Sequence, residues 1–167
     1  VPLYMTDVVD ACLIGRLNLF LQGDTGSGKT QLARDAMGYF PKKSLFILGR
    51  NDMDTRELFQ QINLEKLRTA KSSRGIKELT SRVNTNLIVV DELPNCVPAV
   101  RAQLFNLFDG YIEINGVAYP IGKDYSIGIA TGNIGQRLTE SSNELGRALK
   151  DRMHVIIDVD YFHPKPF

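Results

Sequence analysis

The chain of 167 residues is long enough for one ordinary domain, and its 43% hydrophobic content is enough to form a core. Its formal net charge of +1 argues against a strong nonspecific affinity for nucleic acid or for an anionic membrane. No run of about 18 apolar residues occurs, so we expect no segment that crosses a membrane.

The two cysteines, Cys12 and Cys96, lie far apart and lack the spacing of metal ligands. They are typical of reduced thiols, so we expect a cytoplasmic protein without a disulfide. The first apolar stretch is interrupted by Asp7 and Asp10, and we therefore predict no secretory signal there. Because the chain begins at Val1, we also expect a fragment of a longer protein.

Five short apolar runs predict buried strands, because they are nearly continuously hydrophobic and rich in valine and isoleucine. They are Leu17–Leu21, Ser44–Leu48, Leu87–Val90, Ser126–Ala130 and Val155–Asp158. Helical patterns lie between them at Thr30–Phe40, which Pro41 ends, and at Pro98–Phe108. Strands that alternate with helices predict an α/β fold with a parallel sheet and right-handed crossovers.

One stretch interrupts this alternation. The segment GYIEINGVAYPIG, residues 110–122, alternates apolar and polar residues on either side of Asn115 and Gly116. An Asn-Gly pair suits the positive φ angles of a type I′ turn, so the segment predicts a β-hairpin inserted between a helix and the next strand.

The octet GDTGSGKT, residues 23–30, lies between a predicted strand and a predicted helix, as expected of a phosphate-binding loop. Glycines let backbone N–H groups wrap phosphates without Cβ clashes, and the helix N-terminus adds its positive dipole end. Lys29 would reach the β- and γ-phosphates, and the Thr30 hydroxyl would ligate Mg²⁺. The predicted nucleotide-binding residues are Gly23, Asp24, Thr25, Gly26, Ser27, Gly28, Lys29, Thr30 and Gln31.

Two carboxylates follow the apolar run within NLIVVDEL, residues 86–93. Asp91 and Glu92 end a predicted strand at the sheet edge where the phosphates would lie. Asp91 would hold Mg²⁺ through water, and Glu92 would polarise an attacking water, which favours hydrolysis over transfer to a second substrate. The alternative is that these carboxylates only cap the next helix.

Two later segments add polar and basic groups. IATGN, residues 129–133, ends the next strand with Thr131 and Asn133, and an amide there would orient the water or contact the γ-phosphate; the alternative is an ordinary polar strand end. ELGRALKDRMHVII offers Arg147, Lys150 and Arg152 before the last strand. An arginine inserted into a neighbouring subunit's site would stabilise transition-state charge, although these residues also fit a solvated helix face.

Together these features resemble the AAA+ ATPases. The run DELPNCVPAVRAQLFNLFDGYIEINGVAYPIGKDYSIGIATGN is similar to the MoxR-like branch, with a Walker B motif, a helix, a β-hairpin insert and a sensor strand in succession. NDMDTRELF, residues 51–59, resembles the region after the second strand in these proteins and in midasin-like ATPases. The resemblance covers residues 8–160, which is the whole α/β core.

The resemblance implies a P-loop NTPase three-layer sandwich whose five-stranded parallel sheet has the order 5-1-4-3-2. It gives Asn133 the sensor-1 role, and it makes Arg152 the best match to the arginine finger, with Arg147 second. Two features depart from the family. Pro94 stands where an asparagine is usual, and the chain ends just beyond the last strand. We therefore expect residues 1–167 to be a single AAA+ core domain without the helical lid.

Other classes of P-loop protein fit less well. The Asn-Lys-x-Asp motif by which GTPases read guanine is absent, and so is the Leu-Ser-Gly-Gly-Gln signature of transporter ATPases. A small-molecule kinase would not need Glu92, and no acceptor-binding lid is evident.

We therefore predict an ATPase that uses ATP and Mg²⁺, self-associates into a ring, expected to be a hexamer, and remodels a protein partner. The hairpin favours a protein client, because it carries no basic edge for phosphate contacts. The basic segment EKLRTAKSSRGIKELTSR, residues 65–82, supports an alternative motor acting on nucleic acid, although it also fits a solvated helix and loop. A nucleotide-dependent assembly switch with low turnover is a third possibility. No membrane partner is expected.

Overall fold

The computed structural model describes residues 4–24, 28–121, 125–134 and 144–161. Five strands form one parallel sheet in the order β2-β3-β6-β1-β7. They are β1 (Leu19–Gln22), β2 (Ser44–Leu48), β3 (Leu87–Asp91), β6 (Ile127–Gly132) and β7 (Val155–Asp158). The α/β fold class is confirmed. The labels differ from the expected 5-1-4-3-2 because two hairpin strands intervene in the chain; counting only these five strands, the order read from β7 is 5-1-4-3-2.

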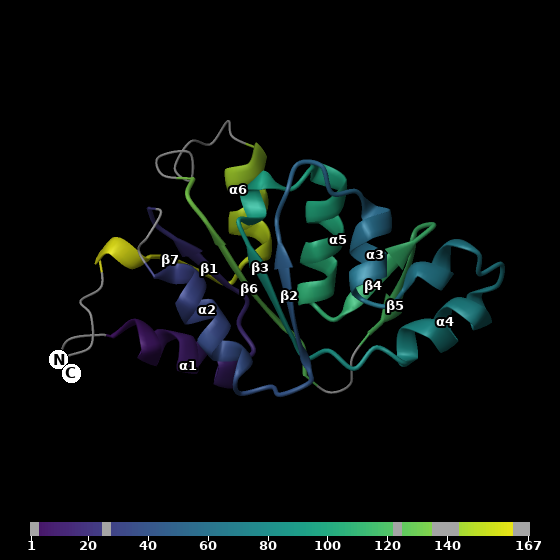
Figure 1. Cartoon of the computed structure of the whole chain (residues 1–167), viewed down its shortest axis with the longest axis horizontal. Coiled ribbons are helices and arrows are strands. Elements are labelled where there is room, and N and C mark those ends of the chain that lie inside the picture. The colour runs from purple at the N-terminus through teal and green to yellow at the C-terminus, as the bar shows by residue number, and fades with distance from the viewer. Residues whose placement is uncertain (1–3, 25–27, 122–124, 135–143, 162–167) are drawn as a thin grey trace.

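Helices cover both faces of the sheet (Figure 1). They are α1 (Met5–Gly15), α2 (Lys29–Met37), α3 (Thr55–Gln61), α4 (Ser73–Ser81), α5 (Pro98–Phe108) and α6 (Glu144–Arg152). Short 3₁₀ turns are η1 (Glu65–Arg68), η2 (Leu93–Asn95) and η4 (Val159–Tyr161). Buried residues of α1 and α2 pack on one face, and those of α3, α4, α5 and α6 belong to the core on the other. The result is a three-layer sandwich.

Successive side chains of each strand enter opposite layers, as strand geometry requires. In β1, Leu19 and Leu21 pack with α1 and α2, whereas Phe20 packs in the core that α5 covers. All four residues of β1 and all six of β6 are buried. This double burial explains why the central strands are nearly continuous apolar runs.

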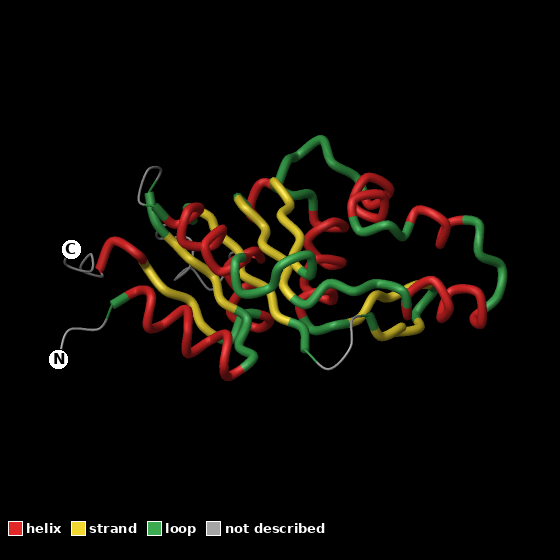
Figure 2. The backbone as a smooth tube through the Cα atoms, turned by 60° about the horizontal axis from the view of Figure 1, so that its bottom comes forward, coloured by secondary structure: helices red, strands yellow, loops and turns green. Residues whose placement is uncertain are grey.

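The predicted hairpin is present. Strands β4 (Tyr111–Ile114) and β5 (Val117–Pro120) pair antiparallel, with Ile112 opposite Tyr119. Asn115 and Gly116 have φ angles of 51° and 80°, as a type I′ turn requires. Figure 2 shows the hairpin apart from the main sheet and beside α4.

Some predicted boundaries were wrong by a few residues. Helix α2 ends at Met37 and not at Phe40, because Gly38, Tyr39 and Phe40 each donate a backbone hydrogen bond three residues back, which closes tight turns. Strand β1 begins at Leu19 and not at Leu17. The N–H of Asn18 donates to His154 Nδ1, so a side chain takes the place of a backbone acceptor at this end of the sheet.

The contact between β6 and α5 requires a glycine. A Cβ at Gly128 would lie 2.1 Å from ring atoms of Phe108, which is 1% exposed and has no space to move into. The missing side chain therefore sets the distance between the helix and the sheet.

We expect Gly128→Ala to destabilise the fold by about 1–3 kcal/mol, because overpacking must displace the Phe108 ring. Urea unfolding followed by circular dichroism measures this change. Gly15→Ala is the matched control, since its Cβ would meet only Leu17 atoms at 3.4 Å or more. Equal stabilities of the two variants would contradict the assigned contact.

Candidate functional site

The phosphate-loop motif joins β1 to α2, as predicted. Gly28 precedes α2 with a φ of 84°, a conformation that favours glycine. Lys29 is the first residue of α2, is 4% exposed, and donates from Nζ to the carbonyl oxygen of Asp24 at 3.1 Å. Predicted residues Thr25, Gly26 and Ser27 lie outside the described part of the chain. The described loop ends thus bring the Lys29 ammonium to the carboxyl end of β1.

The Thr30 hydroxyl donates to Asp91 Oδ1 at 2.8 Å. Thr30 is the second residue of α2, and Asp91 is the last residue of β3. The two predicted metal ligands, separated by 61 residues in the chain, are therefore brought into direct contact. Both present oxygen atoms, the donors that Mg²⁺ prefers.

This oxygen pair fits Mg²⁺ better than it fits a transition metal. Among the described residues, no group of three or more histidines, cysteines or carboxylates could hold a metal ion. Magnesium commonly takes one or two protein oxygens and completes its octahedral shell with water and nucleotide phosphates. Thr30 and Asp91 are the described residues that could hold it in this way.

Asp91 Oδ1 accepts a second hydrogen bond, from the Thr131 hydroxyl at 2.6 Å. Thr131 lies in β6, next to β3 in the sheet, and is fully buried. The same hydroxyl accepts from the backbone N–H of Glu92 at 3.1 Å. Thr131 therefore bonds to both residues of the acidic strand end.

Glu92 has a left-handed backbone, with φ 58° and ψ 47°. For a residue other than glycine this conformation costs about 1–3 kcal/mol, so the surrounding contacts must hold it. The adjoining backbone is close to Gly49, whose N–H donates to the Asp91 carbonyl at 2.6 Å. A Cβ at position 49 would lie 2.2 Å from the Glu92 carbonyl oxygen.

The Glu92 carboxylate is half-buried and makes no hydrogen bond or ion pair with any described residue. Glu92 directly follows β3, and its role stays a prediction; the left-handed turn was not anticipated from the sequence.

Asn133 lies beside the phosphate loop. Its Nδ2 donates to Asp24 Oδ1 at 3.3 Å, and its Oδ1 accepts from Gln22 Nε2 at 3.1 Å. The Gln22 Oε1 in turn accepts from the N–H of Ile134 at 2.7 Å. Gln22, which is 5% exposed, thus joins the ends of β1 and β6.

Sequence reasoning missed Gln22 and gave Thr131 no specific role. Both carry the signal that marked Asn133, a polar residue at the end of an apolar strand. A polar residue at a strand end does not reveal its hydrogen-bond partner or how deeply it is buried. The partners of Gln22 and Thr131 lie 111 and 40 residues away in the chain.

Pro94, which stands where the family usually has asparagine, lies close to the end of β6. Pro94 is the second residue of η2, which begins directly after Glu92, and it packs on Gly132 at the end of β6. A Cβ at Gly132 would lie 2.6 Å from Pro94 ring atoms. Proline and glycine together let η2 approach the strand end closely.

Of the two predicted arginines, Arg152 lies away from this chain's acidic strand end. Arg152 ends α6 just before β7, at the sheet edge where the strands begin, whereas Asp91 and Glu92 lie where they end. Its Nη2 donates to Asn106 Oδ1 at 2.8 Å and lies 3.7 Å from Asp109 Oδ2. Arg147 is exposed on the same helix.

Cys96 and His154 have structural roles. Burial raises the pKa of the Cys96 thiol, although a backbone hydrogen bond from Arg50 and the charge of Arg101 oppose this effect. His154 accepts the Asn18 N–H through Nδ1 at 2.9 Å, at the edge opposite the acidic strand end. Neither side chain contacts Asp91 or Glu92.

The basic segment, residues 65–82, forms η1, a connecting turn and α4. Its described cationic side chains are exposed, namely Lys66, Lys71, Arg74, Lys77 and Arg82. Arg82 pairs with Glu78 at 2.8 Å. The segment is therefore a solvated surface, remote in the fold from the acidic strand end.

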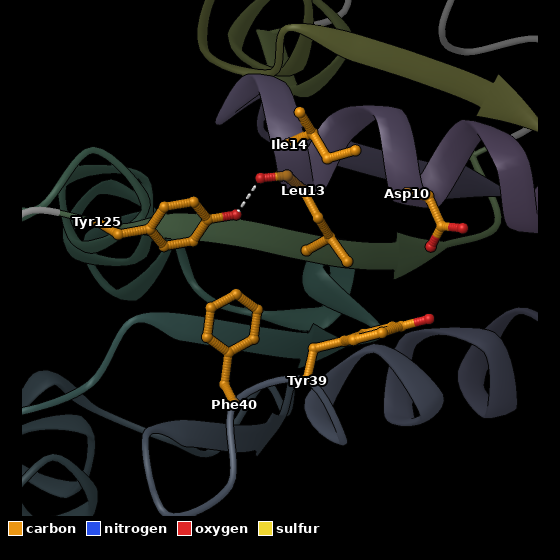
Figure 3. A pocket seen from close by; sticks show the side chains of 6 residues that line it. All are labelled: Asp10, Leu13, Ile14, Tyr39, Phe40 and Tyr125. Atoms are coloured by element: carbon orange, nitrogen blue, oxygen red, sulfur yellow. Dashed lines mark hydrogen bonds between the residues drawn. The ribbon is translucent and has the colours of Figure 1, made fainter.

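An apolar groove of about 340 Å³ lies between α1 and the residues that follow α2 (Figure 3). Tyr39 and Phe40 form one wall, and Leu13 and Ile14 form the other. The Tyr125 hydroxyl donates to the carbonyl oxygen of Leu13 at its end. The groove contains none of the predicted site residues, so it is distinct from the phosphate-loop site.

No helix in the described ranges has both the length and the apolar character needed to cross a membrane.

Comparison with known proteins agrees with this geometry. Residues 18–153 match the family model of the AAA domain (dynein-related subfamily). No curated protein matches the chain.

Two solved structures are similar. Closed-state Hsp104 with ATPγS and FITC casein has a TM-score of 0.56 at 17% identity, over 91% of this chain and 31% of that chain. A candidate ATPase from Cytophaga hutchinsonii has a TM-score of 0.55 at 18% identity, over 98% of this chain and 48% of that chain. At these identities the likeness shows the fold, and this chain spans less than half the length of either protein.

We expect Gln22→Met to keep the buried volume while it removes the acceptor of the Ile134 N–H and the donor to Asn133. An unpaired buried amide costs about 1–3 kcal/mol, so hydrogen exchange of the Ile134 amide should accelerate by roughly tenfold or more. Amide exchange followed by NMR measures this rate. Gln31→Met is the matched control, because Gln31 is exposed and its one side-chain bond to a described residue is to Asp35. Unchanged Ile134 exchange in Gln22→Met would contradict the assigned bond.

Proposed function

Since the chain belongs to the AAA domains of the dynein-related subfamily, we propose that it binds ATP with Mg²⁺ and hydrolyses it to ADP and phosphate. The observation that carries the proposal is the meeting of Thr30, Asp91, Thr131 and Glu92 at the carboxyl ends of neighbouring strands. Ligands of open α/β sheets bind at this edge.

Binding is assigned to the residues around the phosphate loop. The loop N–H groups and the start of α2 would hold the phosphates, and Lys29 would neutralise charge on the β- and γ-phosphates. Thr30 and Asp91 would hold Mg²⁺, Asp91 through a water. The bound ion supplies charge neutralisation to the phosphoryl oxygens. Lys29 is preorganised for this role because its carbon chain is buried and its ammonium already lies at the loop.

Hydrolysis is assigned to Glu92 and Asn133. The Glu92 carboxylate, which bonds to none of the described residues, would accept a hydrogen bond from a water and orient it toward the γ-phosphorus. Asn133 contacts Asp24 of the loop, which supports a role in sensing the γ-phosphate. Because the proposed base acts on a water molecule, we favour hydrolysis over transfer of the phosphoryl group to another substrate.

Arg152 is assigned to a neighbouring subunit, with Arg147 as the second choice. Its position at the opposite edge from this chain's acidic strand end excludes a contact within the same site. An arginine supplied by another copy would stabilise the transition state, so activity would require a ring, which we propose is a hexamer.

We propose a protein partner as the substrate of remodelling, in the manner of the MoxR-like branch. Support comes from the hairpin, which is inserted between α5 and β6 and has no lysine or arginine in β4 or β5. Its exposed residues include Glu113 and Val117, so it offers few contacts to phosphates. The exposed cations of the basic segment favour nucleic acid as a second candidate. Stimulation of turnover by added DNA would support that candidate.

We expect Glu92→Gln to bind ATP normally and to hydrolyse it at least about 100-fold more slowly, because the amide is a poor base. Phosphate release and nucleotide binding are measured on the same preparation. Lys29→Ala is the companion variant, expected to lose binding as well as turnover. Wild-type turnover in Glu92→Gln would refute the assigned base, and very slow turnover in the unmodified chain would favour the assembly switch.

We expect Arg152→Ala to bind ATP but to lose hydrolysis by about 10³-fold or more. A mixture with Lys29→Ala should regain activity, because the Lys29→Ala subunit supplies Arg152 to the intact loop of its neighbour. Phosphate release is followed while the two inactive variants are mixed at increasing concentration. Mixed assemblies seen by native mass spectrometry without any regained activity would rule out the shared site. Thermal unfolding of Arg152→Ala checks that loss of the Asn106 contact has not unfolded the chain.

A further inference from the structure

The hydroxyl of Thr131 is the described group that bonds both to the proposed metal carboxylate and to the peptide of the proposed base. It donates to Asp91 Oδ1 at 2.6 Å and accepts from the Glu92 N–H at 3.1 Å. One oxygen atom therefore uses its hydrogen toward the first residue and a lone pair toward the second.

Thr131 lies in the interior of the sheet, away from bulk solvent. The residue is 0% exposed, and its neighbour in β1 is Leu21, also fully buried. Because the side chain is fully buried, removal of the hydroxyl would take away the acceptor that the structure gives the Glu92 N–H.

The backbone at Glu92 needs this support. Its left-handed conformation is disfavoured for glutamate, and it is held on one side by the close approach of Gly49. Thr131 supplies the hydrogen bond to the peptide that begins the turn. The direction in which the Glu92 carboxylate leaves the strand therefore depends on the Thr131 hydroxyl.

The end of β6 also contacts the phosphate loop. The N–H of Gly23, the first residue of the loop, donates to the carbonyl oxygen of Gly132 at 3.2 Å. Thr131 and Gly132 are consecutive, so one strand end bonds to the phosphate loop, to the carboxylate of Asp91 and to the backbone of Glu92.

We propose that Thr131 is a positioning residue for hydrolysis: its hydroxyl fixes Asp91 for Mg²⁺ and holds the Glu92 peptide so that the carboxylate faces the attacking water. The inference rests on the proposed function. A change at Asp91 is transmitted to Glu92 through a single oxygen, so metal binding and water activation are coupled by this residue.

The test compares Thr131→Ser, which keeps the hydroxyl, with Thr131→Ala, which differs from it only by that oxygen. We expect Thr131→Ala to lower kcat by about tenfold or more, with a smaller change in KM, and to raise the Mg²⁺ concentration for half-maximal activity by a similar factor. Thr131→Ser should stay within about threefold of the unmodified chain in both quantities. Equal kcat and equal Mg²⁺ dependence in the two variants would overturn the proposal.

A second readout does not depend on turnover. ADP binding is measured by thermal shift with and without Mg²⁺, and the additional shift that Mg²⁺ brings should shrink in Thr131→Ala and persist in Thr131→Ser. If the unmodified chain does not hydrolyse ATP, the proposed function fails, while this comparison still decides whether Thr131 supports the metal site. An equal Mg²⁺ effect in both variants would exclude that support.

Thr80→Val is the matched control for loss of a buried hydroxyl. Thr80 is 1% exposed and donates to the Lys77 carbonyl in α4, away from the phosphate-loop site. We expect it to leave kcat and the Mg²⁺ dependence unchanged. A fall in kcat equal to that of Thr131→Ala would mean that any buried hydroxyl matters through stability alone, which would overturn the positioning role.

Discussion

A single carboxylate oxygen, Asp91 Oδ1, joins three elements of the fold. It accepts from Thr30 at the start of α2 and from Thr131 in β6, while its own residue ends β3. This convergence is possible because parallel strands end at the same sheet edge and because α2 begins there. Hydrogen bonds to this one oxygen thus join the start of α2, the end of β3 and the end of β6, in addition to the contacts that each strand end makes separately.

Two glycines allow neighbouring backbone segments to approach each other closely at this edge of the sheet. Gly49 lies against the Glu92 carbonyl, and Gly132 lies against Pro94. A Cβ at either glycine would come within 2.6 Å of its neighbour, so both contacts require glycine. The proline that departs from the family pattern is accommodated by one of these glycines, Gly132.

The sequence predicted those features that local patterns determine. Hydrophobicity and turn chemistry gave the positions of β2, β7, α5 and the Asn115–Gly116 turn. The motifs marked Thr30 and Asp91 as a pair of metal ligands, and the two side chains are in contact. Helix α1 escaped prediction, since aspartates interrupt its apolar residues. The roles of Gln22 and Thr131 also escaped it, because they depend on register between strands distant in the chain and on complete burial. The contact of Arg152 with a neighbouring subunit stays a prediction, because a pattern within one chain does not specify a contact between two chains.

The bond between the Gly49 N–H and the Asp91 carbonyl has a mechanical consequence. Gly49 is the first residue after β2, which is the edge strand of the sheet, and the loop of residues 49–54 leaves the sheet from it. Arg50 and Asp52 lie in this loop, so a molecule that binds them would contact the segment whose first residue bonds to the peptide between Asp91 and Glu92. If Glu92 is the base that we propose, a displacement of residues 49–54 would therefore change the position of its carboxylate through the Gly49 bond.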